Sequence, residues 1–169
     1  MTRPQMLYVD MDGTLTEYRM GLPQAAYSEK GFYITLKPHA NVVKAINSLI
    51  ERQKKLGIRL CALSSVAKEA VHAEREKIDW LSLYVPELEY RFLPWMMNKS
   101  DYVDDLRPED ALLDDFNVNL QQWRGTKIKL VNGVNDRTGS WGGPRVYFDD
   151  PPEEIAERII NILMSARPR

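Results

Sequence analysis

The chain has 169 residues, of which 44% are hydrophobic and 28% are charged, as in a globular protein that buries a core of its own. Its net charge of −1 gives no basic surface of the kind that binds nucleic acid through bulk electrostatics, so we expect no nucleic-acid partner. We expect a cytoplasmic protein with no membrane partner, because the sequence shows neither an apolar leader nor an apolar run of membrane-spanning length. Composition leaves the oligomeric state open.

The first predicted element is a strand, Gln5–Val9, which leads into two aspartates on alternate positions. Alternation along a strand points Asp10 and Asp12 to the same side. Gly13 then allows a sharp turn whose amides can face an anion. Two converging carboxylates repel each other, and one would tend to take up a proton. A divalent metal with a phosphate beside it is the economical explanation of this pattern.

The next segment, residues 15–36, has no clear period and carries four aromatic side chains among glycine and proline positions. It is too long for a tight connection, so we predict a small cap insertion and a candidate lid over the site. We expect its aromatic side chains to close over the core in preference to stacking on a base. The four tryptophans of the chain are likewise expected to be packing residues.

The remainder of the chain alternates between apolar runs and helical periodicity. A helix is predicted over residues 38–55, with Gly57 after its end, and a second strand over residues 58–63 is broken by Ser64 and Ser65. Further strands are predicted over residues 89–93, 111–113 and 127–131, with helices over 66–80 and 152–164 and a glycine-rich loop over 132–144. This order predicts one α/β domain over residues 1–169, with a mainly parallel, Rossmann-like sheet and helices on both faces.

Side chains suited to phosphate chemistry stand at the carboxyl ends of these strands, where such sheets bind ligands. Carboxylates can hold a hard cation, and hydroxyls, amides and a lysine can hold phosphate oxygens. One carboxylate can attack phosphorus while another moves the proton. Together these are the parts that phosphoryl transfer requires. The set comprises Asp10, Asp12, Ser64, Ser65, Lys99, Asp114 and Asp115.

Plain structural roles compete with this interpretation. Acids at a strand end often form a solvated turn, which is as good an account of Asp114 and Asp115 taken alone. A serine pair after a strand caps a helix more often than it binds phosphate, although a helix N-terminus is itself an anion site. In the 132–144 loop, Asn132, Asn135 and Arg137 could reach a substrate, but a turn is the favoured role.

The segments at the strand ends resemble, in order, the four motifs of the haloacid dehalogenase (HAD) superfamily of phosphatases. Within that superfamily the chain most resembles the 5'(3')-deoxyribonucleotidase group, through Leu36-Lys37-Pro38 before the first helix, the serine pair and the paired aspartates. The resemblance covers about residues 5–131. The motifs are Asp10-Met11-Asp12-Gly13-Thr14, Leu63-Ser64-Ser65, Lys99 and Leu112-Leu113-Asp114-Asp115.

The resemblance implies a role for each matched position. Asp10 would be the nucleophile that forms an aspartyl-phosphate, and Asp12 would protonate the departing alcohol and then activate water. Mg²⁺ would be held by the Asp10 carboxylate, the Asp12 backbone carbonyl and one of the Asp114–Asp115 pair. The sequence does not distinguish which of these two aspartates is the ligand. The phosphoryl group would be held by Ser64, Ser65, Lys99 and the backbone around Met11 and Gly13. Lys68 is the alternative to Lys99, whose spacing to Asp114 is longer than in the resembled group.

These roles imply a Mg²⁺-dependent phosphomonoesterase whose substrate is a small phosphorylated molecule, with (deoxy)nucleoside monophosphates favoured. The segment 15–36 is far shorter than the helical cap of deoxyribonucleotidases, which leaves a sugar phosphate or a nucleic-acid end as alternative substrates. A third hypothesis is a non-catalytic nucleotide-binding module. The presence of a suitable residue at every catalytic position argues against it.

Overall fold

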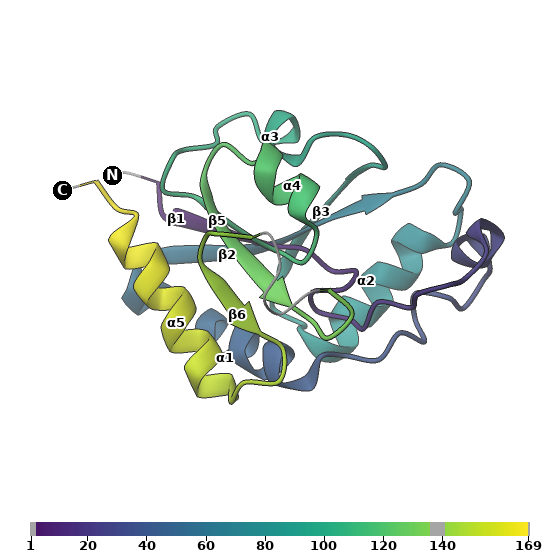
Figure 1. Cartoon of the computed structure of the whole chain (residues 1–169), viewed down its shortest axis with the longest axis horizontal. Helices are drawn as coiled ribbons and strands as arrows, with labels where there is room; N and C mark the ends of the chain where they lie inside the picture. The colour runs from purple at the N-terminus through teal and green to yellow at the C-terminus, as the bar shows by residue number, and fades with distance from the viewer. Residues whose placement is uncertain (1–2, 136–140, 169) are drawn as a thin grey trace.

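Six parallel strands form the centre of the computed structural model, which describes residues 3–135 and 141–168 (Figure 1). Their order across the sheet is β3-β2-β1-β4-β5-β6, so that the chain builds outward from β1 first to one side and then to the other. Ligands of open α/β sheets bind where the strand order reverses, here beyond the carboxyl ends of β1 and β4. The strands are β1 (Gln5–Val9), β2 (Ile58–Val66), β3 (Glu89–Pro94), β4 (Ala111–Asp114), β5 (Thr126–Val131) and β6 (Arg145–Tyr147).

Helices cover both faces of this sheet (Figure 1). Side chains alternate along β1, so Leu7 and Val9 join one core cluster while Met6 and Tyr8 join the other. The first cluster is completed by α1 (Ala40–Leu56), α2 (Ala73–Tyr84) and α5 (Pro152–Ser165). The second is covered by α3 (Lys99–Tyr102) and α4 (Asn117–Gln122). The predicted α/β, Rossmann-like class with helices on both faces is therefore confirmed.

The predicted periodicities explain why these segments fold as they do. All five residues of β1 are buried, as expected of a central parallel strand covered on both faces. The apolar stripe of α1, which includes Ile46 and Leu49, is fully buried, and each such side chain stabilises the fold by about 1.5–3 kcal/mol. Gly57 ends this helix in the left-handed conformation with φ 65°, which glycine adopts without steric cost.

Two predicted boundaries are wrong. The second strand does not break at Ser64 and Ser65 but continues to Val66, because these residues pair in register with Phe92, Leu93 and Pro94 of β3. The next helix begins at Ala73 and not at Val66, since hydrogen bonds from the Ala70 and Ala73 amides to the Ala67 and Ala70 carbonyls make successive turns first. The short elements β6 and α4 were not predicted.

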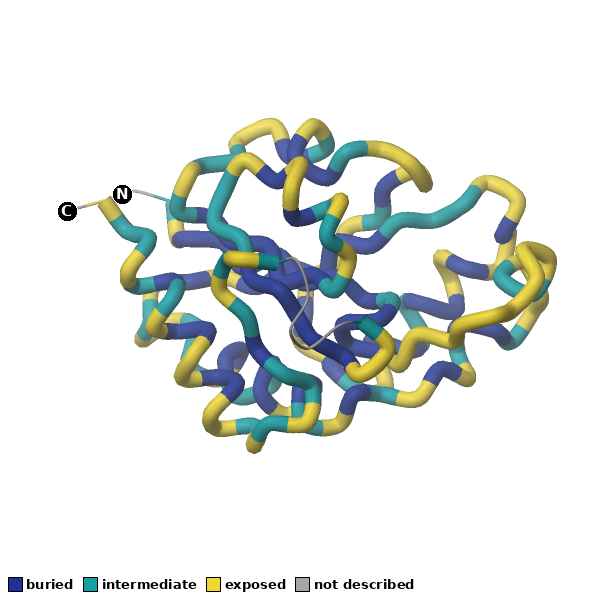
Figure 2. The backbone as a smooth tube through the Cα atoms, viewed as in Figure 1, coloured by how far each residue is buried: buried dark blue, intermediate teal, exposed yellow. Residues whose placement is uncertain are grey.

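The insertion over residues 15–36 contains one short 3₁₀ helix, Gln24–Ser28 (η1). Most of residues 17–30 are exposed, as the yellow stretch in Figure 2 shows. Its final part is different, because Phe32, Tyr33 and Leu36 are buried against Ala70 and Ala73. The insertion is therefore exposed along its middle part and packed at its end. No helix in the described part of the chain is both long and apolar enough to cross a membrane.

Candidate active site

The loop that leaves β1 forms a tight turn around a single carbonyl. The amides of Thr14, Leu15 and Thr16 all donate to the Met11 carbonyl, at 3.2, 2.9 and 3.0 Å. Gly13 has φ 83° within this turn, and a Cβ there would lie 2.4 Å from Oδ2 of Asp115. The position therefore requires glycine for its backbone conformation and also for the close approach of a carboxylate.

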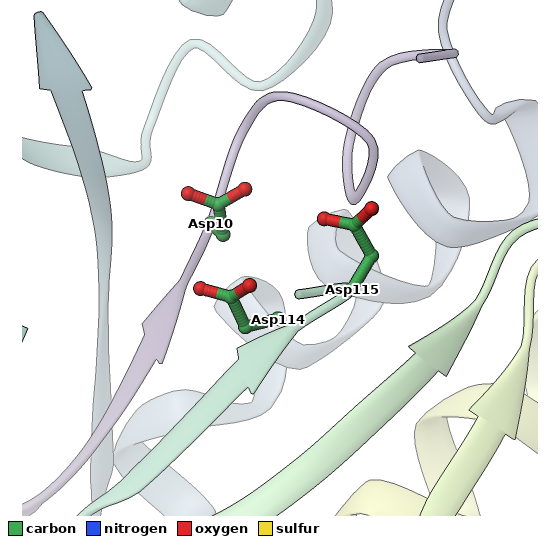
Figure 3. A group of neighbouring side chains, drawn as sticks. All are labelled: Asp10, Asp114 and Asp115. Atoms are coloured by element: carbon green, nitrogen blue, oxygen red, sulfur yellow. The ribbon is translucent and has the colours of Figure 1, made fainter. Parts of the chain in front are cut away.

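Three carboxylates meet beside this turn (Figure 3). Asp10 follows β1, Asp114 ends β4 and Asp115 comes next, and the pairing of Val9 with Leu113 sets the strand ends side by side. One oxygen from each carboxylate lies within 4.8 Å of the other two. The sheet thus brings together Asp10, Asp114 and Asp115, as the sequence predicted, in a group that could hold a metal ion.

Lys99, the first residue of α3, contacts two carboxylates of this group. Its Nζ lies 2.6 Å from Oδ1 of Asp10 and 2.7 Å from Oδ2 of Asp114. Burial lowers the pKa of Lys99, but the carboxylates of Asp10 and Asp114 outweigh it and raise that pKa above its usual value. This lysine is therefore held in its charged form between two acids.

The carboxylates retain an excess of negative charge despite Lys99. Burial raises the pKa of Asp10 to about 7; Lys99 opposes this shift, and Asp114 and Asp12 add to it. Burial of its carboxyl group, followed by the charges of Asp114 and Asp10, raises the pKa of Asp115 well above its usual range. A cation among these oxygens would relieve both shifts. The donor set, all carboxylate oxygen, fits a hard divalent ion such as Mg²⁺.

The two neighbouring aspartates differ in their partners. Asp114 is fully buried and accepts from the Phe116 amide at 2.8 Å, from Asn119 at 3.0 Å and from Lys99. The Asp115 carboxylate accepts from Asn132 at 2.9 Å and from the Thr14 hydroxyl at 3.4 Å. Asp114 is thus fixed by the protein on several sides, whereas Asp115 is held more loosely and faces the turn around Gly13.

Asn132 connects the site to the loop after β5. Its Nδ2 donates to Asp115 and also, at 2.7 Å, to the Gly13 carbonyl. Its Oδ1 accepts from the amides of Val134 and Asn135, so the predicted turn is confirmed. Asn132 therefore forms the turn and also contacts the site, although the sequence had suggested these two roles as alternatives. Arg137, the third candidate in this loop, lies outside the described residues.

Asp12 is held by a lysine that the sequence did not predict. Lys77 on α2 is fully buried, and its Nζ lies 2.5 Å from Oδ2 of Asp12, 2.9 Å from the Ser64 hydroxyl and 2.9 Å from the Ser65 carbonyl. Within the described structure, Oδ1 of Asp12 is buried and has no hydrogen-bond partner. The Asp12 side chain therefore stands apart from the three-carboxylate group, with one oxygen fixed and the other free.

The proposed alternative, Lys68, is exposed. It lies in the wall of a neighbouring cavity with Glu69 and Glu74. The sequence contains a signal for Lys77: Ala73, Lys77 and Leu81 are spaced four residues apart, so a lysine occupies the buried stripe of an amphipathic helix. A charged residue at such a position needs a buried partner.

A cavity of about 330 Å³ opens beside Asp12 and Ser65. The insertion supplies most of its wall, with Phe32 and Tyr33 at the buried end. Trp95 faces it from the loop after β3 with 57% of its surface exposed, so the prediction that all four tryptophans are packing residues is wrong for this one. Its other lining residues are Glu17, Tyr18, Arg19, Leu22, Gln24, Tyr27, Leu36 and Ala67.

No family model matches this sequence, and no curated protein matches it. Among solved structures, the chain is similar to D,D-heptose 1,7-bisphosphate phosphatase from Burkholderia thailandensis, with 12% identity and a TM-score of 0.58 over 92% of this chain and 98% of that one. It is also similar to a chain of the Pnkp1/Rnl/Hen1 complex, with 17% identity and a TM-score of 0.50 over 75% of this chain and 45% of that one. At these identities the likeness shows the fold, which is an α/β, Rossmann-like fold.

Proposed function

We propose that the protein is a Mg²⁺-dependent phosphomonoesterase that acts through an aspartyl-phosphate, with nucleoside monophosphates as its substrates. The observation that carries the proposal is that the two aspartates after β1, Asp10 and Asp12, have different surroundings. Asp10 lies in a group of carboxylates with Lys99, while Asp12 lines a cavity and has one buried oxygen that has no hydrogen-bond partner within the described structure. The first arrangement suits attack on phosphorus, and the second suits proton transfer at the leaving group.

In the first half-reaction, an Asp10 carboxylate oxygen attacks phosphorus and the bond from phosphorus to the leaving oxygen breaks. Asp12 gives its proton to that oxygen, so an alcohol departs and an acyl phosphate remains on Asp10. Lys99 fixes Oδ1 of Asp10, and Lys77 fixes Oδ2 of Asp12, so both reacting groups are oriented beforehand. When bound by Asp10, the Asp12 carbonyl and Asp114 or Asp115, Mg²⁺ would offset the charge of the transferring phosphoryl group.

In the second half-reaction, a water oxygen attacks the same phosphorus and the bond to Asp10 breaks. Asp12 takes the proton from that water, and inorganic phosphate and the free Asp10 carboxylate are released. The Ser64 hydroxyl and the backbone around Gly13 can bind phosphate oxygens during both steps. Lys77, which orients Asp12, joins the residues that the sequence predicted.

The cavity favours a small substrate with a planar leaving group. Its volume of about 330 Å³ and its aromatic wall suit a nucleoside more than a long polymer. The adjoining cavity, which shares Ala67 and Trp95 with this one, carries Glu69 and Glu74 against Lys68. This negative balance opposes a polyanion, so a phosphorylated nucleic-acid end is the weaker candidate.

The test is a substrate panel with purified protein in the presence and absence of Mg²⁺. It compares deoxynucleoside and ribonucleoside monophosphates, sugar phosphates, p-nitrophenyl phosphate and phosphorylated oligonucleotides, with released phosphate as the readout. We expect nucleoside monophosphates to have the highest kcat/KM and Asp10→Asn to abolish turnover. Activity that survives in Asp10→Asn would refute the nucleophile, and a preference for sugar phosphates or oligonucleotides would refute the substrate.

A further inference from the structure

A buried carboxylate on α2 holds the end of the insertion by its backbone. Glu76 is 8% exposed, and its oxygens accept from the amides of Gly31 at 2.5 Å, Tyr33 at 3.0 Å and Ile34 at 3.5 Å. Among the ion pairs of the described residues, none includes Glu76. Converging amide dipoles therefore stabilise the charge of this side chain. The arrangement resembles an anion-binding site in which the Glu76 carboxylate takes the place of the anion.

The insertion is shaped to receive this carboxylate. Gly31 has φ 90°, a left-handed conformation that glycine adopts far more readily than other residues, although a Cβ there would meet nothing within 4 Å. The glycine is thus required by the backbone path that presents its amide to Glu76, and not by lack of space. Trp80, one turn further along α2, adds a hydrogen bond of 2.8 Å from its Nε1 to the Leu36 carbonyl.

The same turn of α2 supports Asp12. Lys77 follows Glu76 directly, binds Asp12 and lies with its Nζ 4.7 Å from the centre of the Tyr33 ring. The Tyr33 amide donates a hydrogen bond to Glu76, and Tyr33 lines the cavity together with Phe32. The wall of the cavity and the Asp12 carboxylate beside it are therefore placed by adjacent residues of one helix.

We infer that Glu76 is a positioning residue that fixes this wall and thereby determines which leaving groups the site accepts. The inference rests on the proposed function, since it concerns the leaving-group side of the same site. Glu76 does not contact Asp10, Lys99 or the carboxylates of β4, so the phosphate side of the site does not depend on it. In this inference, the buried end of the segment that the sequence suggested as a candidate lid acts as a fixed wall.

The test is Glu76→Gln, which keeps the shape of the side chain but turns an NH₂ group toward amide donors. The matched control is Glu74→Gln, an exposed position on the same turn. For the best nucleoside monophosphate we expect kcat/KM to fall about tenfold, mainly through KM, because a charge-assisted hydrogen bond is lost. For acetyl phosphate, whose leaving group is too small to reach the wall, we expect less than about a twofold change. Equal losses on both substrates, or no loss on either, would overturn the inference.

A second variant and a second readout separate this inference from the proposed function. Gly31→Ala perturbs the same contact from the insertion and should reproduce the selective loss if Glu76→Gln does not fold. Hydrogen exchange requires no turnover: the amides of residues 31–34 should exchange faster in Glu76→Gln than in wild type, while those of β1 remain protected. If the wild type hydrolyses nothing but these amides respond, the proposed function fails and the positioning role stands. Unchanged exchange would refute the positioning role itself.

Discussion

Replacing Lys77 with methionine removes the ammonium group that connects Asp12 to the end of β2. Lys77 is fully buried and binds three oxygens, on Asp12, Ser64 and Ser65. Breaking a buried ion pair from one side costs about 3–5 kcal/mol. The Asp12 side chain is 32% exposed and can recover some hydration, so we expect the free energy of unfolding to fall by about 2–3 kcal/mol. Methionine fills the stripe between Ala73 and Leu81 with a similar volume, which limits any cavity cost.

The effect on activity should exceed the effect on stability. Without Lys77, Asp12 loses the contact that orients it, and positioned acid–base groups contribute about 10²–10⁴ in rate. We expect kcat to fall at least about 100-fold. Urea unfolding of the same preparations measures the accompanying change in the free energy of unfolding. The control is Lys68→Met, a lysine on the loop before α2 that lines the neighbouring cavity and should retain both stability and activity. A Lys77→Met enzyme with wild-type kcat would refute the assignment of Lys77 to the site.

Three further predictions concern the turn, the metal and pH. Gly13→Ala would place a Cβ 2.4 Å from Asp115 in a left-handed backbone, so phosphatase activity should be lost; an active Gly13→Ala enzyme would contradict the closeness of this contact. Mg²⁺ at about 100 times its Kd should raise the free energy of unfolding of the wild type by about 2.7 kcal/mol. In thermal melts the same Mg²⁺ concentration should stabilise Asp115→Asn clearly less, and equal stabilisation of both proteins would exclude Asp115 as a ligand. Burial lowers the pKa of His39, so the folded state prefers the neutral ring, and the stability that His39 contributes should be lost as pH falls below its ordinary value of about 6.5. His39→Gln should therefore lose less stability than wild type between pH 7.5 and pH 5 in paired melts, and identical losses would contradict this sign.

The sequence was sufficient to predict the fold because its strongest signals coincide. The apolar run of β1 ends in a motif with two aspartates and a glycine, and the later strands are separated by helical periodicity of the expected length. The three residues of β6 and the six of α4 are too short for periodicity to show. The extension of β2 through Ser64 and Ser65 depends on pairing with β3, which no local pattern contains.

The site was predicted at the strand ends and at Lys99, and it was missed on α2, which supplies Glu76 and Lys77. Asp10, Asp114 and Asp115 come from strand ends, and parallel topology alone brings them together. Lys77 lies among glutamates, arginine and aspartate on α2, so its neighbours in sequence made it resemble a solvated residue. Glu76 was missed for the same reason, since its partners are backbone amides 42 to 45 residues earlier in the chain, and backbone groups leave no signature in a sequence.

The two site lysines reach the aspartates from opposite layers of the molecule. Lys77 comes from α2 on one face of the sheet, whereas Lys99 comes from α3 on the other. Damage to the α2 layer should therefore impair Asp12, and damage to the α3 layer should impair Asp10. With p-nitrophenyl phosphate, whose phenolate leaves without a proton, Lys77 variants should still form the phosphoenzyme and accumulate it, while Lys99 variants should form little of it. Acid quenching within the first turnover should therefore detect a burst of phosphoenzyme in the Lys77 variants and little phosphoenzyme in the Lys99 variants.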